Sequence, residues 1–439
     1  MTPTPERRIG LGLATGLVAG NIIGSGVFLL PATLGAIGSV SVFGWIFGTL
    51  AAFATTAVFA QLGRIASTPE GLVGYAGAGL GRLAGFAIAV FYWMGAWVGT
   101  VAMAVAIAGY FAVFVPALAA PIPLALTAVA ALWILTGVNI LGARAATRLS
   151  SLTLVAGLLP ILSVAIAGWA VFDPKVFAAS WNVSGQSDFG AVKTSMISVF
   201  WAFTGFESAA VATAVVRDPE RNVARATYAG TALAAVVYIA ASTALMGMAP
   251  ARELAASTAP FALAVGKVLG PAAALVVAAC ALAKTCGTCC GWILVSAESA
   301  RAGANVHLFP GRFAAHGGRL PVRILLVMAA VMSAAVLATV SPSLGKQFGV
   351  LINVSTVWVI IPYAVCCVAL WRLAGRLSPA ARLASRVAAV LALAFNGLLL
   401  ATSDAPTVWL TAALALAIAI LWFAVARRAG KAVLTVASG

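Results

Sequence analysis

Long stretches without a charged residue dominate this chain and restrict what it can fold into. One runs from Ile9 to Gly63 and another from Leu83 to Ala143, and neither contains Asp, Glu, Lys or Arg. Because a helix needs about 20 apolar residues to cross a bilayer, each stretch is long enough for two spans. A chain with 63% apolar and 8% charged residues is typical of an all-α integral membrane protein.

Eight further apolar segments bring the predicted number of membrane spans to twelve. If the N-terminus is cytoplasmic, the inner loops carry 20 of the 26 basic residues and the outer loops carry five. This bias follows the positive-inside rule, so we expect both termini in the cytoplasm and no nucleic acid partner. The run from Ile9 is too long for a cleavable signal peptide. The eight segments cover approximately residues 149–172, 194–213, 226–249, 268–297, 324–341, 347–371, 386–403 and 406–426.

Two loops on the cytoplasmic side have recognisable boundaries. The segment from Arg64 to Arg82 contains several glycines and Pro69, so we expect a loop there. The polar stretch from Arg217 to Asn222 predicts a turn, with the next span starting at Pro219 and the acids beside it. Between the first two spans, a turn is expected near residues 35–42.

The residues Gly24-Ser25-Gly26 interrupt the first predicted span. In lipid, an unpaired backbone N–H or C=O costs several kcal/mol, so a helix opens only where it lines a cavity or is covered by protein. The interruption predicts a binding site in which amides of the following half-helix face an anion. Close packing of helices through small residues is the alternative.

A second interruption is predicted in the sixth span, at Thr204-Gly205. The first and sixth spans occupy matching places if the chain consists of two five-span repeats, and such paired interruptions are typical of transporter sites. Glu207, in the same span, is the only acid far from a membrane edge. A carboxyl at that depth favours proton sensing or a gate hydrogen bond, although a structural hydrogen bond to a neighbouring helix would also explain it.

Lys284 is the other charge within a predicted span, and it should face the bundle interior. Three roles stay open from the sequence: replacement of a coupling cation, pairing with Glu207, or binding of loose backbone carbonyls. The indoles of Trp201 and Trp292 lie beside small residues in the two spans that bear these charges, where a ring face could bind a cation.

All six cysteines lie in apolar segments, three of them close together at Cys286, Cys289 and Cys290. A soft-metal site is one interpretation, but His307 and His316 both lie in a polar loop away from them. We therefore expect these cysteines to pack between helices, with no metal and no cofactor.

Several motifs, spread over essentially the whole chain, resemble the arginine/agmatine antiporters of the basic amino acid/polyamine antiporter family, within the amino acid–polyamine–organocation superfamily. The most specific are the Gly-Ser-Gly interruption and the Trp201–Ser208 stretch with its Gly-Phe-Glu-Ser sequence. The likeness extends over residues 21–32, 91–99, 179–185, 201–209, 217–223, 291–292 and 362–363.

The resemblance implies a single transporter domain over residues 1–439 with a five-plus-five inverted-repeat (LeuT-like) core. The first repeat would cover about 9–172 and the second about 194–371, with broken helices 1 and 6 and two extra helices at 386–426. It also implies alternating-access exchange of an external amino acid, such as arginine, for an internal amine, such as agmatine. The protein would lie in the bacterial inner membrane, often as a homodimer.

The resemblance also assigns roles to individual residues. The substrate carboxylate would bind at Ser25 and Gly26 beside Ile22, and the α-amine at the backbone around Trp201 and Thr204. Trp201 would close the outer side and Trp292 would form the middle gate. The inner gate would comprise Tyr92, Glu207 and Tyr363, and the distal pocket Ala96, Thr100, Met103 and Ser355.

Three residues depart from the family pattern. Thr100 replaces an Asn, Thr204 replaces an apolar residue, and Lys284 replaces a small neutral residue. These departures leave open a proton-coupled or lysine-gated carrier of neutral amino acids on the same fold. An enzyme is disfavoured because the predicted spans contain no His, acidic cluster or metal-ligand set, and a sensor because no soluble output domain is present.

Overall fold

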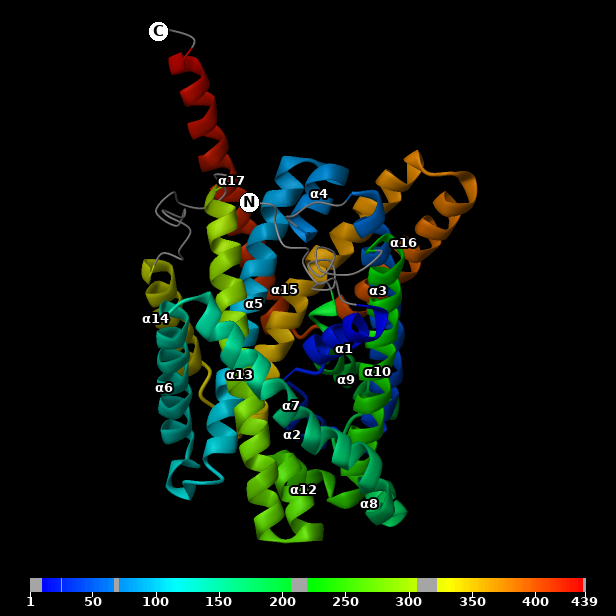
Figure 1. Ribbon diagram of the computed structural model, residues 1–439, viewed down its shortest axis with the longest axis vertical. Helices are drawn as coiled ribbons and strands as arrows, with labels where there is room; N and C mark the ends of the chain where they lie inside the picture. Colours follow the sequence, from blue (N-terminus) through cyan, green and yellow to red (C-terminus); the bar gives the residue numbers. More distant parts are fainter. Residues whose placement is uncertain (1–9, 25, 67–70, 207–218, 306–321, 437–439) are drawn as a thin grey trace.

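The computed structural model describes residues 10–24, 26–66, 71–206, 219–305 and 322–436, and every regular element within them is helical (Figure 1). Nine helices in these residues are long and apolar enough to cross a membrane. The predicted helical membrane architecture is therefore confirmed. The nine are α3 (Val42–Ile65), α5 (Arg82–Phe111), α6 (Pro121–Ile140), α7 (Ala143–Ala167), α10 (Pro219–Met248), α13 (Pro271–Asn305), α15 (Leu344–Leu373), α16 (Pro379–Leu400) and α17 (Ala405–Val436).

Burial separates the central helices from those that face lipid. In the most apolar windows of α5 and α15, 72% of the residues are buried, compared with 28% for α16 and 11% for α17. α5 packs along both α15 and α13, while α16 packs against α15 and α3. α5 and α15 thus form the interior of the protein, and their small residues allow the backbones to approach closely.

The first membrane segment is interrupted where the sequence predicts. α1 (Leu11–Ile22) ends at the predicted break, a 3-10 turn covers Gly26–Phe28, and α2 (Leu30–Gly35) resumes the path. The amide of Gly24 bonds to the carbonyl of Ile22, 2.6 Å away, so the helical i−4 pattern is lost there. The expected turn before the second span is also present, since α3 begins at Val42.

The second predicted interruption lies at the end of α9 (Asp188–Phe203). Thr204 is extended, with φ −61° and ψ 143°, and Gly205 has φ 108°, a left-handed conformation that favours glycine. The amide and the hydroxyl of Thr204 both donate to the carbonyl of Trp201. The part of the predicted sixth span from residue 207 onward, including Glu207, lies outside the described residues.

One sequence prediction is wrong. The Gly-rich segment after Arg64 contains a helix, α4 (Leu72–Leu80), where a loop is expected. α4 packs against α5 and α15, and Leu72, Tyr75 and Ala76 are buried. Gly79 lies so close to Ala369 that an added Cβ would fall 2.7 Å from the alanine Cβ. The glycines that weaken an isolated helix therefore allow this one to dock, and tertiary packing outweighs the low propensity.

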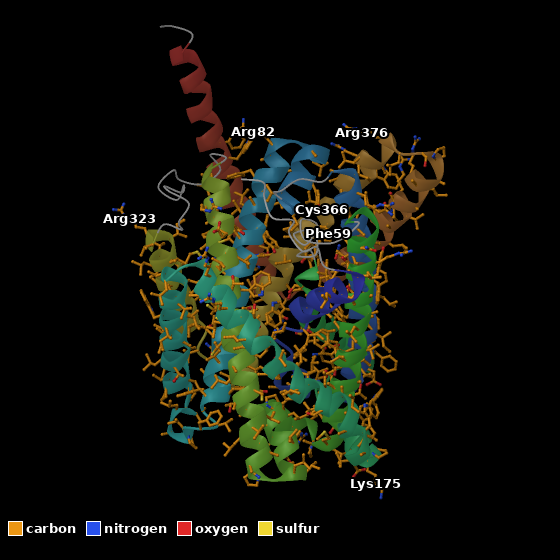
Figure 2. The ribbon with its side chains drawn as sticks, viewed as in Figure 1. Phe59, Arg82, Lys175, Arg323, Cys366 and Arg376 are labelled. Atoms are coloured by element: carbon orange, nitrogen blue, oxygen red, sulfur yellow. The ribbon has the colours of Figure 1, made fainter. Side chains whose placement is uncertain are left out.

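Short helices cover the ends of the bundle. α8 (Pro174–Ala179), α11 (Ala251–Ala256) and α12 (Pro260–Leu269) lie between the longer helices, and α14 (Val322–Ala338) packs against α6. α10 begins at Pro219, as predicted. Figure 2 shows Arg82, Arg323 and Arg376 at one end of the bundle and Lys175 at the other, which agrees with the predicted separation of inner and outer loops.

Candidate functional site

A small cavity lies between α5, α9, α13 and α15, next to the two interrupted segments. Its walls include half of the fourteen site residues that the sequence singles out: Tyr92, Ala96, Met103, Trp201, Thr204, Trp292 and Ser355. Gly95, Gly99 and Val359 complete the lining. Four helices that are far apart in the sequence thus bring the predicted substrate residues together.

The cavity is too small for a substrate in this structure. The space open to the centre of a water molecule is about 20 Å³, which is room for about one water. The Trp201 side chain is only 6% exposed and packs edge-on against Phe348, with ring centroids 5.5 Å apart. Any substrate larger than water therefore requires Trp201 or a neighbouring wall to move.

Gly26 brings the first interruption into contact with this indole. A Cβ at residue 26 would overlap the six-membered ring of Trp201. The backbone after the break in α1 therefore lies directly against the side chain at the break in α9. Only glycine permits this approach, which explains the small residues in the first interrupted segment.

The opposite wall of the cavity is a close crossing of α5 and α15. The Ser355 hydroxyl donates to the carbonyl of Gly95, 2.8 Å away. A Cβ at Gly95 would fall 2.7 Å from a methyl carbon of Val359, and one at Gly99 would fall 2.9 Å from the Ser355 Oγ. Gly95 and Gly99, four residues apart on one helix face, thus set the distance between the two central helices.

Two tyrosines hold the interrupted backbone in place. The Tyr238 hydroxyl on α10 lies 2.7 Å from the carbonyl oxygen of Ile22 and 3.1 Å from that of Ala202. On the other side of the first break, the Tyr110 hydroxyl donates to the carbonyl of Phe28, 2.7 Å away. These hydroxyls bond to carbonyls at the interrupted helix ends, where the regular i−4 amide partners are lost, and the Ile22 carbonyl also accepts from the Gly24 amide.

The electrostatics of the site come mainly from helix ends and aromatic rings, because none of the lining residues is charged. α1 and α9 both terminate at their interruptions, and the C-terminal end of a helix carries a partial negative charge. The rings of Tyr92, Trp201 and Trp292 supply π faces that attract cations. The arrangement therefore suits an ammonium group.

The other predicted site residues lie around the cavity or outside the described residues. Ile22 is buried with its carbonyl accepting from Tyr238, and Thr100 is buried with its hydroxyl donating to Ala96 of the same helix. Neither is among the lining residues. Ser25 and Glu207 are outside the described residues. Tyr363 is fully buried against three phenylalanines, including Phe206 just beyond the second interruption, with ring centroids 5.2 Å apart.

Lys284 does not line the cavity. The residue is 4% exposed, and its Nζ lies 3.5 Å from the carbonyl oxygen of Gly20, in the last turn of α1. Its aliphatic stem crosses Gly157 of α7 so closely that a Cβ there would overlap it. The ammonium thus lies at the C-terminal end of the first half-helix, where a positive charge is favourable.

Sequence reasoning missed Tyr238, Tyr110, Gly95 and Gly99. A signal for the tyrosines was available, since the chain has only six of them and these two fall within apolar segments. A buried Tyr hydroxyl needs an acceptor, and an interrupted helix is a source of free carbonyls. The two glycines gave no such signal among the 43 glycines of the chain.

A helical membrane bundle with a small, aromatic-lined cavity beside two interrupted helices defines the class of membrane transporters. Residues 9–427 match the family model described as amino acid permease, and the chain belongs to this family. It is 38% identical to the cadaverine/lysine antiporter of Escherichia coli K12 over 378 residues, which cover 84% of each chain.

Two further relatives carry the name putrescine transporter PotE. The chain is 34% identical to that of Escherichia coli K12, over 84% of each chain. It is 32% identical to that of Haemophilus influenzae, over 83% of this chain and 84% of the relative. The family and these relatives are transporters and not enzymes.

Proposed function

We propose that this protein exchanges an external basic amino acid for the internal amine that forms from it by decarboxylation, by alternating access across the bacterial inner membrane. The observation that carries the proposal is the uncharged, aromatic cavity that has the C-terminal end of α9 in its wall, with the break after α1 packed against Trp201 of that wall. It offers partial negative charge and ring faces to ammonium groups, while amides at the start of the turn beginning at Gly26 are suited to a carboxylate.

Substrates that end in an ammonium group fit this cavity better than arginine. Thr100, which replaces the family Asn, is outside the lining, and its hydroxyl proton is already donated to Ala96. The described lining therefore contains no side-chain carboxylate or amide to accept from a guanidinium. With relatives named for cadaverine, lysine and putrescine, we expect lysine/cadaverine or ornithine/putrescine exchange to exceed arginine/agmatine exchange.

The finer architecture belongs to the same proposal. We infer twelve spans with both termini in the cytoplasm, in which α1 and α2 form one interrupted span, and α9 and α14 contribute to two more. The positions of the two breaks support a five-plus-five repeat, with one repeat at about 9–172 and the other at 194–371. Tyr92 and Tyr363 would form the inner gate with Glu207, which would sense protons, and the functional unit would be a homodimer.

Lys284 would act as a positioning residue for α1. Its contact with Gly20 favours the third of the roles that the sequence leaves open, the binding of loose carbonyls. A charge at a helix end gains at most about 2 kcal/mol, whereas burial of an ion costs several kcal/mol. Stability alone therefore does not account for Lys284, and we assign it to the movement of α1 during transport.

Counterflow in proteoliposomes tests the exchange. Vesicles containing the purified protein are loaded with cadaverine, putrescine, agmatine or buffer alone, and uptake of labelled lysine, ornithine and arginine is measured. We expect uptake only in vesicles that contain an amine, and the fastest uptake with the matched lysine or ornithine pairs. Uptake of neutral amino acids into buffer-loaded vesicles, driven by a proton gradient, would overturn exchange in favour of the proton-coupled carrier.

A further inference from the structure

The segment from the end of α15 to the second turn of α16 carries four arginines: Arg372 in α15, Arg376 in the connection, and Arg382 and Arg386 in α16. Between Glu298 and Asp404 the sequence contains no acid that could balance them. Figure 2 shows Arg376 at the end of the bundle that also carries Arg82 and Arg323. We propose that this arginine-rich segment binds the phosphate of an anionic phospholipid. Such a site goes beyond the proposed transport function.

Two of these guanidinium groups are held in place by the protein. The Arg386 guanidinium carbon lies 4.8 Å from the centre of the Trp371 ring, and Arg382 donates from Nη2 to the carbonyl of Leu377, 3.1 Å away. A guanidinium fixed by stacking and by one backbone bond loses little further entropy when it binds a phosphate. Both side chains are thus preorganised for an anion.

Donors remain available on both arginines. Among the described residues, neither Arg382 nor Arg386 forms a salt bridge, and the buried Nε of each has no acceptor. A guanidinium has five N–H donors in a fork that matches two phosphate oxygens. The buried Nε atoms are out of reach of a surface ligand, so the donors available to a phosphate are the Nη groups, of which Arg382 Nη2 also donates to Leu377.

The surface on the membrane side of the arginines is apolar, which favours a lipid over free phosphate. Trp371 is 44% exposed, and Val368, one turn deeper on α15, is 38% exposed. On α16, Val387 and Val390 are 49% and 52% exposed. Val390 lies one turn beyond Arg386 on the same helix face. A phosphate at the guanidinium groups would therefore place acyl chains along this apolar surface.

The arginine-rich segment lies on helices that lead from the lipid to the transport site. α15 carries Ser355 and Val359 of the cavity wall, and α16 packs on α3, which in turn packs on α9. A lipid that bridges α15 and α16 would support the part of the bundle against which the interrupted helices lie.

Native mass spectrometry of the full chain tests the site. The protein is purified with phosphatidylglycerol, and the lipid retained by Arg382→Gln/Arg386→Gln is compared with that retained by Arg82→Gln/Arg323→Gln, a control that removes two arginines from the same end. We expect the first pair to bind phosphatidylglycerol about tenfold more weakly, because charge-assisted bonds from two guanidinium groups are lost. The control pair should resemble the unmodified protein.

Equal retention by the two pairs would overturn the proposal. Inorganic phosphate and glycerophosphate are also compared as competitors of the bound lipid. If inorganic phosphate displaces the lipid at the same concentration as glycerophosphate, the proposal is overturned in favour of a site for free phosphate. If the glutamine pair fails to fold, Arg382→Lys/Arg386→Lys keeps the charge but loses the fork and the stacking, and we again expect weaker retention than in the control. Because the measurement contains no transported substrate, its outcome is independent of the exchange proposal.

Discussion

The hydroxyl of Tyr238 lies 2.7 Å from the carbonyl oxygen of Ile22, the last residue of α1. The same hydroxyl is 3.1 Å from the carbonyl of Ala202, in the last turn of α9. One side chain on α10 therefore joins the two helix ends that border the cavity, with a single proton shared between their carbonyls. The interruptions are mutually positioned by this contact.

Removal of that hydroxyl should loosen both interruptions. We expect Tyr238→Phe to lower the free energy of unfolding by about 1 kcal/mol, the net contribution of one buried hydrogen bond, because the Ile22 carbonyl keeps the Gly24 amide as a donor. Substrate affinity should fall with it, since the helix ends lose their common anchor. Thermal unfolding and ligand titration in detergent would measure both effects. Tyr228→Phe is the matched control, because Tyr228 lies on the same helix and is 37% exposed. An unchanged Tyr238→Phe protein would contradict the anchoring role.

Gly26→Ala should displace Trp201. The added methyl group overlaps the indole ring, and overpacking of this kind costs about 1–3 kcal/mol. We expect substrate affinity to fall about tenfold or more, measured by isothermal titration with lysine and cadaverine. Gly16→Ala in α1 is the control, because a Cβ there has nothing within 4 Å. Equal affinities of the two variants would show that the contact between Gly26 and Trp201 does not shape the site.

Ser355→Ala tests the crossing of α5 and α15. Loss of the bond to the Gly95 carbonyl should cost about 1 kcal/mol and weaken binding, because Ser355 and Gly95 both line the cavity. Ser333→Ala is the comparison, since the Ser333 hydroxyl accepts from Trp133 of α6 and donates to Ala329, so it also joins two helices but lies away from the cavity. The prediction is wrong if the two variants transport with the same KM.

Lys284→Met keeps the aliphatic stem over Gly157 and removes the charge beside Gly20. Since burial of an ion costs more than its interaction with a helix end returns, we expect the variant to be at least as stable as the unmodified protein. Substrate Kd should remain within about twofold, whereas the rate of exchange should fall about tenfold. Lys346→Met is the control for loss of a lysine, because Lys346 is exposed in the first turn of α15. A variant with a normal exchange rate would remove Lys284 from the transport cycle.

The interruptions could be predicted because they depend on local chemistry. An apolar helix is interrupted at little cost by small residues that form helices poorly. Such residues are present at Gly24-Ser25-Gly26 and at Thr204-Gly205, and the helices end at both places. Seven of the predicted site residues also meet at one cavity, because their sequence positions fall near the breaks or on helices that face them.

The rest depends on which helices touch, and sequence patterns contain little of that information. The glycines after Arg64 predicted a loop, yet this segment forms α4. The helix is stabilised by packing of α4 on its neighbours, with Gly79 in close contact with Ala369. Tyr238 became part of the site only through its approach to two carbonyls from other helices. Lys284 left three roles open from the sequence, and the position of Gly20 now favours one of them.

The size of the cavity beside Trp201 has a consequence for inhibitor discovery. With room for about one water molecule, this conformation has no vacancy that a lysine-sized compound could fill. Competitive drugs shaped like the cargo must therefore capture a more open conformer. Compounds that bind the conformation described here should instead bind its outer, membrane-exposed surfaces.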